Sequence, residues 1–348
     1  MMNYFGGKIE MINVGIVGGT GYTGEILIDI LLNHPNVRIE SVSRKTDSLL
    51  AVSDIFPKFK KRINLICGTL DVKEIIAKCN LVFLALPHTA SMSIVPKLLK
   101  GGLKVIDLSA DYRLKNTLVY QQYYGFKHSD KACLKQAVYG LPELYRNKIK
   151  NATLIANPGC YSTAAILALA PIVALGLVDL GSIIIDAKSG TSGAGKKIDD
   201  GLLFSEVNED FRAYKVNIHQ HAPEINQVLS KLATKFIKVT FVPHLLPINR
   251  GIFETIYVLK AHASGARNLV ELYKKFYKDE PFVRIRKDGD FPRIKDAAGT
   301  NFCDIGIKDY GDKVIIVSVI DNLLKGACGQ AVQNMNIMCK FPETLGLL

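Results

Sequence analysis

The stretch INVGIVGGTGYTGEIL, residues 12–27, decides the fold of the first part of the chain. An apolar run ends in closely spaced glycines and continues into EILIDILLNHP, where apolar residues recur at helical spacing. Gly19, Gly21 and Gly24 match the dinucleotide-binding pattern G-x-G-x-x-G, and Gly18, Gly21 and Gly24 match the pattern G-x-x-G-x-x-G. A strand that turns on glycines into a helix presents backbone N–H groups to a pyrophosphate. We therefore predict a dinucleotide site here, with a purely structural glycine turn as the alternative.

Strand-like and helix-like segments go on alternating to about residue 110, for example VRIESVS, VKEIIAKC and LVFLALP. This rhythm is typical of a parallel sheet with right-handed crossovers. Beyond residue 157 longer β-type runs appear, such as FIKVTFVPHLLP and GIFETIYVLKAHA. The chain of 348 residues is long enough for two domains. We predict an α/β fold: a Rossmann-type parallel-sheet domain up to residue 157, then an α+β domain with a mixed or antiparallel sheet.

The composition favours a cytoplasmic protein without membrane or nucleic-acid partners. The longest apolar run, residues 163–178, is shorter than the ~20 residues of a membrane span and contains Pro171, so we interpret it as a buried helix. The first ten residues lack a signal-peptide core. The net charge of +12 is dispersed, and the chain has no Trp, whereas an RNA-binding module would cluster cations with aromatics. Seven scattered cysteines without a C-x-x-C pair predict reduced thiols and no structural zinc.

The end of the second predicted strand indicates which dinucleotide binds. An NAD site usually has an acidic residue there, but this chain has Ser43, Arg44 and Lys45, which suit a 2′-phosphate. Asp47 is a rival that lies beyond the strand end, and a solvated basic turn is the alternative. We predict NADP(H), and the residues expected to surround its phosphates are Gly18, Thr20, Gly21, Tyr22 and Thr23.

A second strand–turn–helix junction contains the cysteine of NPGCYST, residues 157–163. Asn157-Pro158-Gly159 predicts a tight turn, and helical periodicity begins after it. Cys160 would then lie in the first helical turn, where the helix dipole and unpaired N–H groups favour a thiolate. A buried cysteine acting as a small hydrophobe is the alternative interpretation.

The chain resembles the arginine-biosynthesis branch of the aspartate-semialdehyde dehydrogenase family, from about residue 11 to its end. The motifs that carry the resemblance are GIVGGTGYTGEIL, FLALPHTAS, VIDLSADYRL, YGLPE, NPGCYST, SGTSGAGK, HQHAPEI, PHLLPINRGI and DNLLKGACGQAVQNMN. Thr89 replaces a more common Gly, and Gln220 a more common Arg. The resemblance implies that residues 320–348 return to the nucleotide domain, and that residues 158–319 form the catalytic and oligomerisation domain.

The resemblance also implies roles for the site residues. Cys160 is the expected nucleophile, and a histidine of HQH is the expected acid/base. We favour His219, with His221 as the alternative and as a substrate-binding residue. Two histidines at this spacing share a face of an extended segment and could hold a metal, but no third ligand is evident, so we predict none.

Further residues are expected around the cofactor and the substrate. Ser189 and Gly190 begin the loop SGTSGAGK, which is either near the cofactor or a plain flexible loop. Asn322 is expected near the nicotinamide, although its segment also suits close helix packing. Arg113 and Arg250 are candidates for a substrate carboxylate or phosphate, because a guanidinium matches either bidentately. A surface salt bridge is the alternative for both arginines. Asn157 completes the expected substrate-binding residues.

The implied reaction is NADPH-dependent reductive dephosphorylation of an acyl phosphate, N-acetyl-γ-glutamyl phosphate, to its semialdehyde through a Cys160 thioester, with release of inorganic phosphate. A one-carbon-longer substrate of lysine biosynthesis and aspartate semialdehyde share this chemistry. The resemblance suggests a homodimer or homotetramer, and subunit pairing is one common way to cover the edges of a long sheet.

Overall fold

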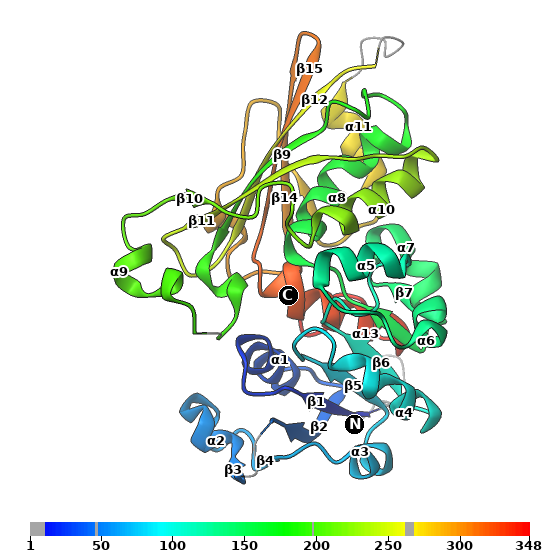
Figure 1. The fold of residues 1–348 in the computed structure, drawn as a ribbon, viewed down its shortest axis with the longest axis vertical. Helices are drawn as coiled ribbons and strands as arrows, with labels where there is room; N and C mark the ends of the chain where they lie inside the picture. The colour runs from blue at the N-terminus through cyan, green and yellow to red at the C-terminus, as the bar shows by residue number, and fades with distance from the viewer. Residues whose placement is uncertain (1–10, 46–47, 197, 262–267) are drawn as a thin grey trace. The chain divides into compact units, whose positions relative to one another are not determined.

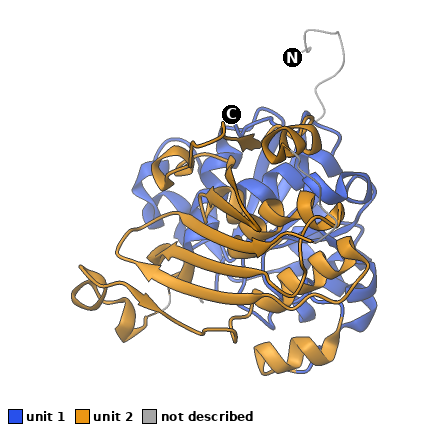
Figure 2. Cartoon of the chain, turned by 90° about the horizontal axis from the view of Figure 1, so that it is seen from above, with its two compact units in different colours: residues 1–115, 127–157, 328–348 blue, residues 116–126, 158–327 orange. Residues whose placement is uncertain are grey.

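The computed structural model describes residues 11–45, 48–196, 198–261 and 268–348. The chain divides into two compact units (Figure 2). Unit 1 comprises residues 1–115, 127–157 and 328–348, and unit 2 comprises residues 116–126 and 158–327. The short segment 116–126 therefore belongs with unit 2, where the hydroxyl of Tyr124 lies 3.5 Å from the Gln220 carbonyl oxygen.

Unit 1 is built on an eight-stranded sheet of the order β3-β4-β2-β1-β5-β6-β8-β7. Every pair in it is parallel except β3 with β4. The strands are β1 (Ile12–Val17), β2 (Val37–Ser43), β3 (Leu50–Ala51), β4 (Ile66–Gly68), β5 (Leu81–Leu84), β6 (Lys104–Asp107), β7 (Val138–Tyr139) and β8 (Leu154–Ala156). The central strands are buried on both faces, as expected for a parallel sheet between helices.

The helices of unit 1 lie in the connections between these strands, apart from the last one (Figure 1). They are α1 (Tyr22–Leu32), α2 (Val52–Ile55), α3 (Val72–Lys78), α4 (Val95–Lys100), α6 (Lys131–Gln136), α7 (Pro142–Ile149) and α13 (Gly329–Met338). The terminal α13 packs against α1, α7 and β6, and all ten of its residues are buried.

Unit 2 contains a seven-stranded sheet of the order β10-β11-β9-β12-β15-β14-β13. Its strands are β9 (Ile184–Gly190), β10 (Arg212–Ala213), β11 (Thr240–Leu246), β12 (Ile252–Leu259), β13 (Val283–Ile285), β14 (Cys303–Tyr310) and β15 (Lys313–Ile320). Two pairs, β9 with β11 and β13 with β14, are parallel and the others are antiparallel. The predicted α/β fold with a mixed second sheet is therefore confirmed.

One face of this sheet, the inner face, is covered by the apolar helix α8 (Cys160–Ala174) and, beyond it, by α10 and α11 (Figure 1). The helices of unit 2 are α5 (Thr117–Tyr124), α8, α9 (Phe204–Val207), α10 (Ala222–Ala233), α11 (Leu269–Phe276) and α12 (Ile294–Ala297), with a π-helical turn at Leu324–Cys328. Thirteen consecutive residues of α8 are buried, which explains the long apolar run in the sequence.

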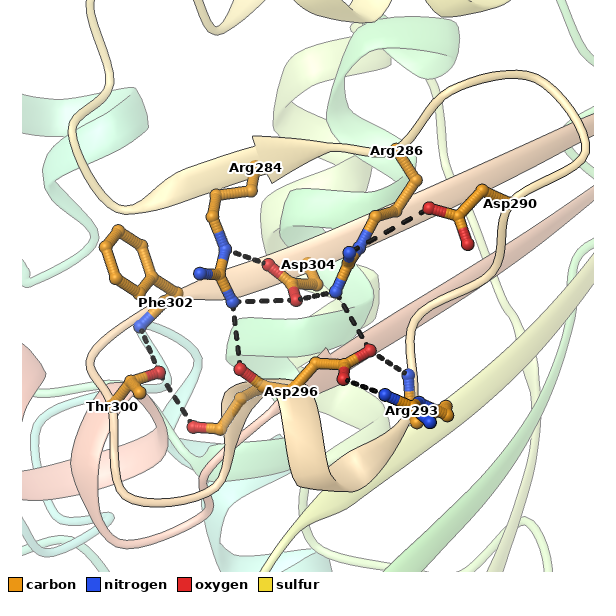
Figure 3. Close-up of polar contacts among 9 residues, drawn as sticks. Arg284, Arg286, Asp290, Arg293, Asp296, Thr300, Phe302 and Asp304 are labelled. Atoms are coloured by element: carbon orange, nitrogen blue, oxygen red, sulfur yellow. Dashed lines mark hydrogen bonds and ion pairs between the residues drawn. The ribbon is translucent and has the colours of Figure 1, made fainter.

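The opposite, outer face is covered at one end by α12. Ile294 and Ala297 pack there against Val317 and Val319 of β15. An ion-pair network fixes the segment that carries α12 (Figure 3). The buried carboxylate of Asp304 accepts hydrogen bonds from Arg284 (2.8 Å) and Arg286 (2.7 Å), and Arg286 also donates to Asp296 of α12 (2.9 Å).

Candidate active site and dinucleotide site

The glycine-rich turn joins β1 to α1 in unit 1. Gly18 has a φ of +86°, and a Cβ atom there would lie 2.2 Å from the carbonyl oxygen of Ala85. A Cβ atom on Gly24 would lie 2.4 Å from the backbone of Gly19. The N-cap of α1 is Gly21, so no cap side chain competes for the N–H groups of the first turn. The turn therefore has the backbone geometry that a pyrophosphate requires.

The end of β2 lies beside this turn. The carbonyl oxygen of Ser43 accepts hydrogen bonds from the N–H groups of Gly18 and Gly19, both at 2.9 Å. Within the described part of the chain, the buried Ser43 hydroxyl and the Arg44 Nε atom have no hydrogen-bond partner. Two buried polar atoms without a protein partner fit an anionic ligand. Lys45 follows on the surface, and Asp47 lies outside the described residues.

Cys160 is the first residue of α8 in unit 2. Its N-cap, Gly159, is extended, and the Gly159 carbonyl oxygen accepts hydrogen bonds from both the N–H and the hydroxyl of Thr163. A Cβ atom on Gly326 would lie 2.7 Å from the Cβ of Cys160, so only glycine allows the π-helical turn to approach this closely. The Cys160 side chain is half-buried, unlike the five buried cysteines. The expected position at a helix N-terminus is the one observed.

Helix α10 supports the residue that precedes the cysteine. The buried carboxylate of Glu224 accepts a hydrogen bond from the Gly159 N–H at 2.9 Å. His221 is the N-cap residue of α10, and a Cβ atom on Gly159 would lie 2.4 Å from its Nε2 atom. The imidazole of His221 thus packs directly against the backbone next to Cys160.

His219 lies in a different environment. Its ring is buried among aromatic rings, with centroids 5.4 Å from Tyr161, 5.6 Å from Tyr214 and 5.5 Å from Phe241. Burial, followed by the proximity of His221, lowers the pKa of His219 to about 2. Its Nδ1 atom accepts the N–H of His221 at 3.1 Å, so the neutral ring carries its proton on Nε2. His219 is therefore a neutral hydrogen-bond donor at ordinary pH.

Arg113 and Asn157 come together in unit 1. Arg113 is 6% exposed, and it donates to the carbonyl oxygens of Asn157 and Leu108, both at 2.7 Å. Asn157 is buried, and its side-chain oxygen accepts from the amide of Asn334 at 3.1 Å. Arg113 is thus buried and not on the surface, and it contacts the residue that leads into the cysteine turn.

Arg250, by contrast, does form an ion pair. Its Nη1 atom lies 3.5 Å from the buried carboxylate of Asp321, and its side chain is 38% exposed. Asp321 also accepts hydrogen bonds from the backbone N–H groups of Gly299, Leu323 and Leu324. The guanidinium of Arg250 therefore has both a fixed anchor and an exposed side.

Asn322, which follows Asp321 in the chain, connects two parts of unit 2. It accepts a hydrogen bond from the Gly251 N–H at 2.8 Å and donates to the Ser192 hydroxyl at 3.0 Å. Ser189 is 3% exposed, and a Cβ atom on Gly190 would lie 2.7 Å from the Asn249 carbonyl oxygen. The start of the SGTSGAGK loop is thus closely packed, not a plain flexible loop.

Sequence reasoning overlooked three contributors to this site: Glu224, Gly326 and Tyr214. Glu224 belongs to the quoted HQHAPEI motif, and its position one helical turn after His221 was an available signal. Gly326 belongs to the quoted DNLLKGACGQAVQNMN motif, but nothing local places it beside Cys160, and Tyr214 lies outside the quoted motifs. The described ranges contain no group of three His, Cys, Asp or Glu side chains placed to hold a metal, and none of their helices is long and apolar enough to cross a bilayer.

Comparison with known proteins agrees with this geometry. Residues 13–152 match the family model described as semialdehyde dehydrogenase, NAD binding domain, and residues 160–322 match semialdehyde dehydrogenase, dimerisation domain. Proteins named N-acetyl-gamma-glutamyl-phosphate reductase from Desulfotalea psychrophila and Pelotomaculum thermopropionicum are 49% and 46% identical. The two alignments cover 97% of this chain and 98% and 97% of those proteins.

Solved structures share the fold at low sequence identity. Aspartate semialdehyde dehydrogenase II from Vibrio cholerae has a TM-score of 0.70 at 17% identity, covering 95% of this chain and 99% of that one. The enzyme from Candida albicans, solved with NADP, has a TM-score of 0.70 at 16% identity over the same shares of the two chains. The resemblance in the motifs is thus confirmed: the chain is an oxidoreductase that belongs to the semialdehyde dehydrogenase family, in the branch of the N-acetyl-gamma-glutamyl-phosphate reductases.

Proposed function

We propose that the chain reduces N-acetyl-γ-glutamyl phosphate to N-acetylglutamate 5-semialdehyde with NADPH, a step of arginine biosynthesis, and releases inorganic phosphate. The observation that carries the proposal is the cysteine turn: Cys160 begins a helix, Glu224 holds the preceding N–H, and His221 packs beside it. The names of relatives that are nearly half identical over the whole chain support the substrate.

Cys160 is the nucleophile. Its thiolate attacks the γ-carbonyl carbon, a C–S bond forms, and phosphate leaves with the electron pair of the broken C–O bond. The resulting thioester splits one difficult step into two easier ones. The N-terminal N–H groups of α8 stabilise the negative charge that develops on the carbonyl oxygen.

The cofactor is NADP(H), held by the glycine turn and by the two polar groups at the end of β2, Ser43 and Arg44. When bound, NADPH supplies the hydride that brings the thioester carbon to the aldehyde level. The C–S bond of the thiohemiacetal then breaks, which releases the aldehyde and restores the Cys160 thiolate. Asn322 and Ser189 shape the loop expected beside the nicotinamide.

The two histidines divide the remaining work. The sequence favours His219 as acid/base, with His221 as the alternative. We propose the alternative, because burial lowers the pKa of His219 and the His221 ring lies against the backbone beside Cys160. His221 borders the cysteine turn, so it accepts the thiol proton and later protonates the oxygen of the departing phosphate. His219 donates a hydrogen bond from Nε2 to the substrate instead.

Two arginines bind the anionic ends of the substrate. Arg113 is anchored on the carbonyl oxygen of Asn157, three residues before the nucleophile, and suits the phosphate. Arg250 keeps an exposed side while Asp321 fixes its position, and it suits the carboxylate. Asn157 maintains this arrangement through its own amide.

The assembly is a homodimer or homotetramer. The name of the matching family model, a dimerisation domain, supports this, and so does the outer face of the seven-stranded sheet. Beyond α12 that face exposes Ile184, Tyr257 and Leu259, which are 43%, 40% and 37% exposed. A second copy would remove these side chains from water.

The reverse reaction tests the proposed function. N-acetylglutamate semialdehyde, phosphate and NADP⁺ are supplied, and NADPH absorbance is followed for the wild type and for Cys160→Ser. Phosphate-dependent turnover that disappears in the variant is the expected result. Turnover only with aspartate semialdehyde, or only with a one-carbon-longer substrate, would overturn the substrate and keep the chemistry. No turnover with any aldehyde would overturn the enzyme mechanism.

A further inference from the structure

One buried acid contacts both the turn beside Cys160 and the arginine that we assign to the substrate carboxylate. Asp321 follows directly after β15, and its side chain is completely buried. Strand β15 pairs along its whole length with both β12 and β14, so the backbone at its end is fixed on two sides. Asp321 is therefore a rigid point of unit 2 that can position the groups around it.

The main chain of Asp321 positions the segment that packs against the cysteine. Its carbonyl oxygen accepts a hydrogen bond from the Gly326 N–H at 2.9 Å, within the π-helical turn. A Cβ atom on Gly326 would lie 2.7 Å from the Cβ of Cys160 and 3.2 Å from that same carbonyl oxygen. A single glycine is therefore all that separates Asp321 from Cys160 in space.

The two carboxylate oxygens of Asp321 have separate roles. Oδ1 accepts the N–H groups of Leu323 and Leu324, at 2.8 and 3.0 Å, and so caps the π-helical turn. Oδ2 accepts the N–H of Gly299 at 2.8 Å and lies 3.5 Å from Nη1 of Arg250. An asparagine oxygen would cap the turn as well as an aspartate oxygen does. The buried negative charge is therefore explained by the Oδ2 side, where Arg250 pairs with it.

The backbone of Arg250 is fixed as well. The following residue, Gly251, has a φ of +120°, and a Cβ atom there would lie 2.4 Å from Cγ2 of Ile294 in α12. The Gly251 N–H donates to the side-chain oxygen of Asn322 at 2.8 Å. The guanidinium of Arg250 thus extends from a rigid backbone, and its ion pair with Asp321 fixes its direction.

These contacts form a chain from Cys160, through Gly326 and Asp321, to Arg250. A substrate that is bound by its carboxylate at one end and attacked at its carbonyl carbon at the other has to match the span between the two groups. We propose that Asp321 is a positioning residue that sets this span, so that acyl chains of glutamyl length are selected over homologues with one more methylene. The inference rests on the proposed function, which assigns Arg250 to the carboxylate and Cys160 to the acyl carbon.

The test uses three aldehydes in the reverse reaction with phosphate and NADP⁺. They are N-acetylglutamate semialdehyde, its homologue with one more methylene, and its α-carboxamide, which lacks the charge that Arg250 would bind. The wild type is compared with Asp321→Asn, which removes the ion pair while an amide oxygen still caps the turn. Asp304→Asn is the matched control, because Asp304 is also a completely buried carboxylate, but its partners are Arg284 and Arg286 of the outer-face network (Figure 3).

We expect the wild type to prefer the shorter semialdehyde by about 10- to 200-fold in kcat/KM, the usual discrimination for one methylene. Asp321→Asn should lower this preference by at least about five-fold, through a higher KM for the shorter semialdehyde at nearly constant kcat. Its kcat/KM for the carboxamide should equal that of the wild type. Asp304→Asn should lower the melting temperature, because it breaks buried ion pairs, and keep the length preference.

A second variant, Arg250→Gln, keeps the test decisive if Asp321→Asn does not fold. Arg250 is 38% exposed, so its replacement should leave the fold intact, and the same fall in preference is expected. An unchanged preference in either variant would overturn the inference. So would an equal fall in kcat/KM for all three aldehydes, or a fall in preference in Asp304→Asn, because either result would make the effect a general loss of structure.

Failure of the inference and failure of the proposed function give different results. A wild type that is inactive with every aldehyde would overturn the proposed function and this inference with it. An active wild type whose length preference survives in Asp321→Asn would overturn the inference alone.

Discussion

The chain contains two strand–turn–helix junctions, and they are built differently. At residues 17–22 the turn depends on glycine and backbone alone: Gly18 has a positive φ, and its neighbours leave no room for a Cβ atom. At residues 156–160 the turn depends on remote side chains. Glu224 holds the Gly159 N–H, and His221 and Gly326 flank the cysteine turn.

The difference shows what each site must do. A phosphate site needs N–H groups pointing at an anion, which a local glycine pattern supplies. A nucleophile needs a proton acceptor and a fixed approach, and these come from side chains on other elements. The following predictions test that contrast, from the largest expected effect to the smallest.

Removal of the Cys160 thiol should have the largest effect. Cys160→Ala is expected to lower kcat by at least about 10³-fold, because no thioester forms. NADP⁺ affinity, measured by calorimetry, should stay unchanged, since the glycine turn lies in the other junction. Residual turnover above one-hundredth of the wild-type rate would show that the cysteine turn is not the reacting centre.

Replacement of each histidine in turn by glutamine should separate their roles. His221→Gln is expected to lower kcat by about 10²- to 10⁴-fold, the usual range for a general acid/base. His219→Gln should cost only about five-fold, the equivalent of one neutral hydrogen bond of about 1 kcal/mol. The pH profile of kcat/KM should lose its imidazole limb only in His221→Gln, because His219 stays neutral at those pH values. The opposite pattern would restore His219 as the acid/base.

Loss of Arg44 should affect only the nucleotide junction. Arg44→Ala is expected to raise the KM for NADP⁺ by about 10- to 100-fold, because a hydrogen bond to a charged group contributes about 1.5–3 kcal/mol. The KM for NAD⁺ should barely change. Equal effects on both nucleotides would place the 2′-phosphate elsewhere.

A buried acid beneath the cysteine helix offers a pH-dependent test. Glu254 lies on the inner face of β12, fully buried, and no described residue makes a hydrogen bond to its carboxyl group. Burial raises the pKa of Glu254 well above its ordinary value. The unfolded chain ionises near the ordinary pKa, so the folded wild type loses stability as pH rises from there toward the raised value.

Glu254→Gln removes this titration. The gap in melting temperature between variant and wild type should therefore widen as pH rises from 5 to 8, as measured by calorimetry. Glu254→Leu should be more stable than wild type by about 1–3 kcal/mol at pH 8, because it no longer buries a polar group without a partner. A gap that stays constant with pH would mean that Glu254 does not titrate in this range.

The smallest effect is expected at Thr89. This β-branched residue has a φ of +75°, and its N–H donates to the buried carboxylate of Asp111 at 2.8 Å. Thr89→Gly should raise the free energy of unfolding by about 1 kcal/mol, because glycine adopts this conformation without strain. Calorimetry at pH 7 measures this free energy of unfolding. A less stable Thr89→Gly protein would show that contacts of the Thr89 side chain stabilise the fold by more than its backbone strain destabilises it.

The amino-acid sequence by itself determined the alternation of strands and helices, the glycine turn and the position of Cys160 at a helix N-terminus. These features follow from periodicity and from residue types that act on their immediate neighbours. Which of the two histidines is the more buried was beyond its reach. They are two residues apart in one motif, and only the packing of His219 against Tyr214 and Phe241 distinguishes its ring from that of His221.

The tertiary structure alone decided the rest of the site. Glu224 contacts Gly159 and Asn334 contacts Asn157 across long stretches of chain, and Gly326 meets Cys160 because a π-helical turn passes beside it. The assignment of residues 116–126 to unit 2 follows the same rule. Such contacts depend on how distant segments fill space, and short-range patterns carry no information about that.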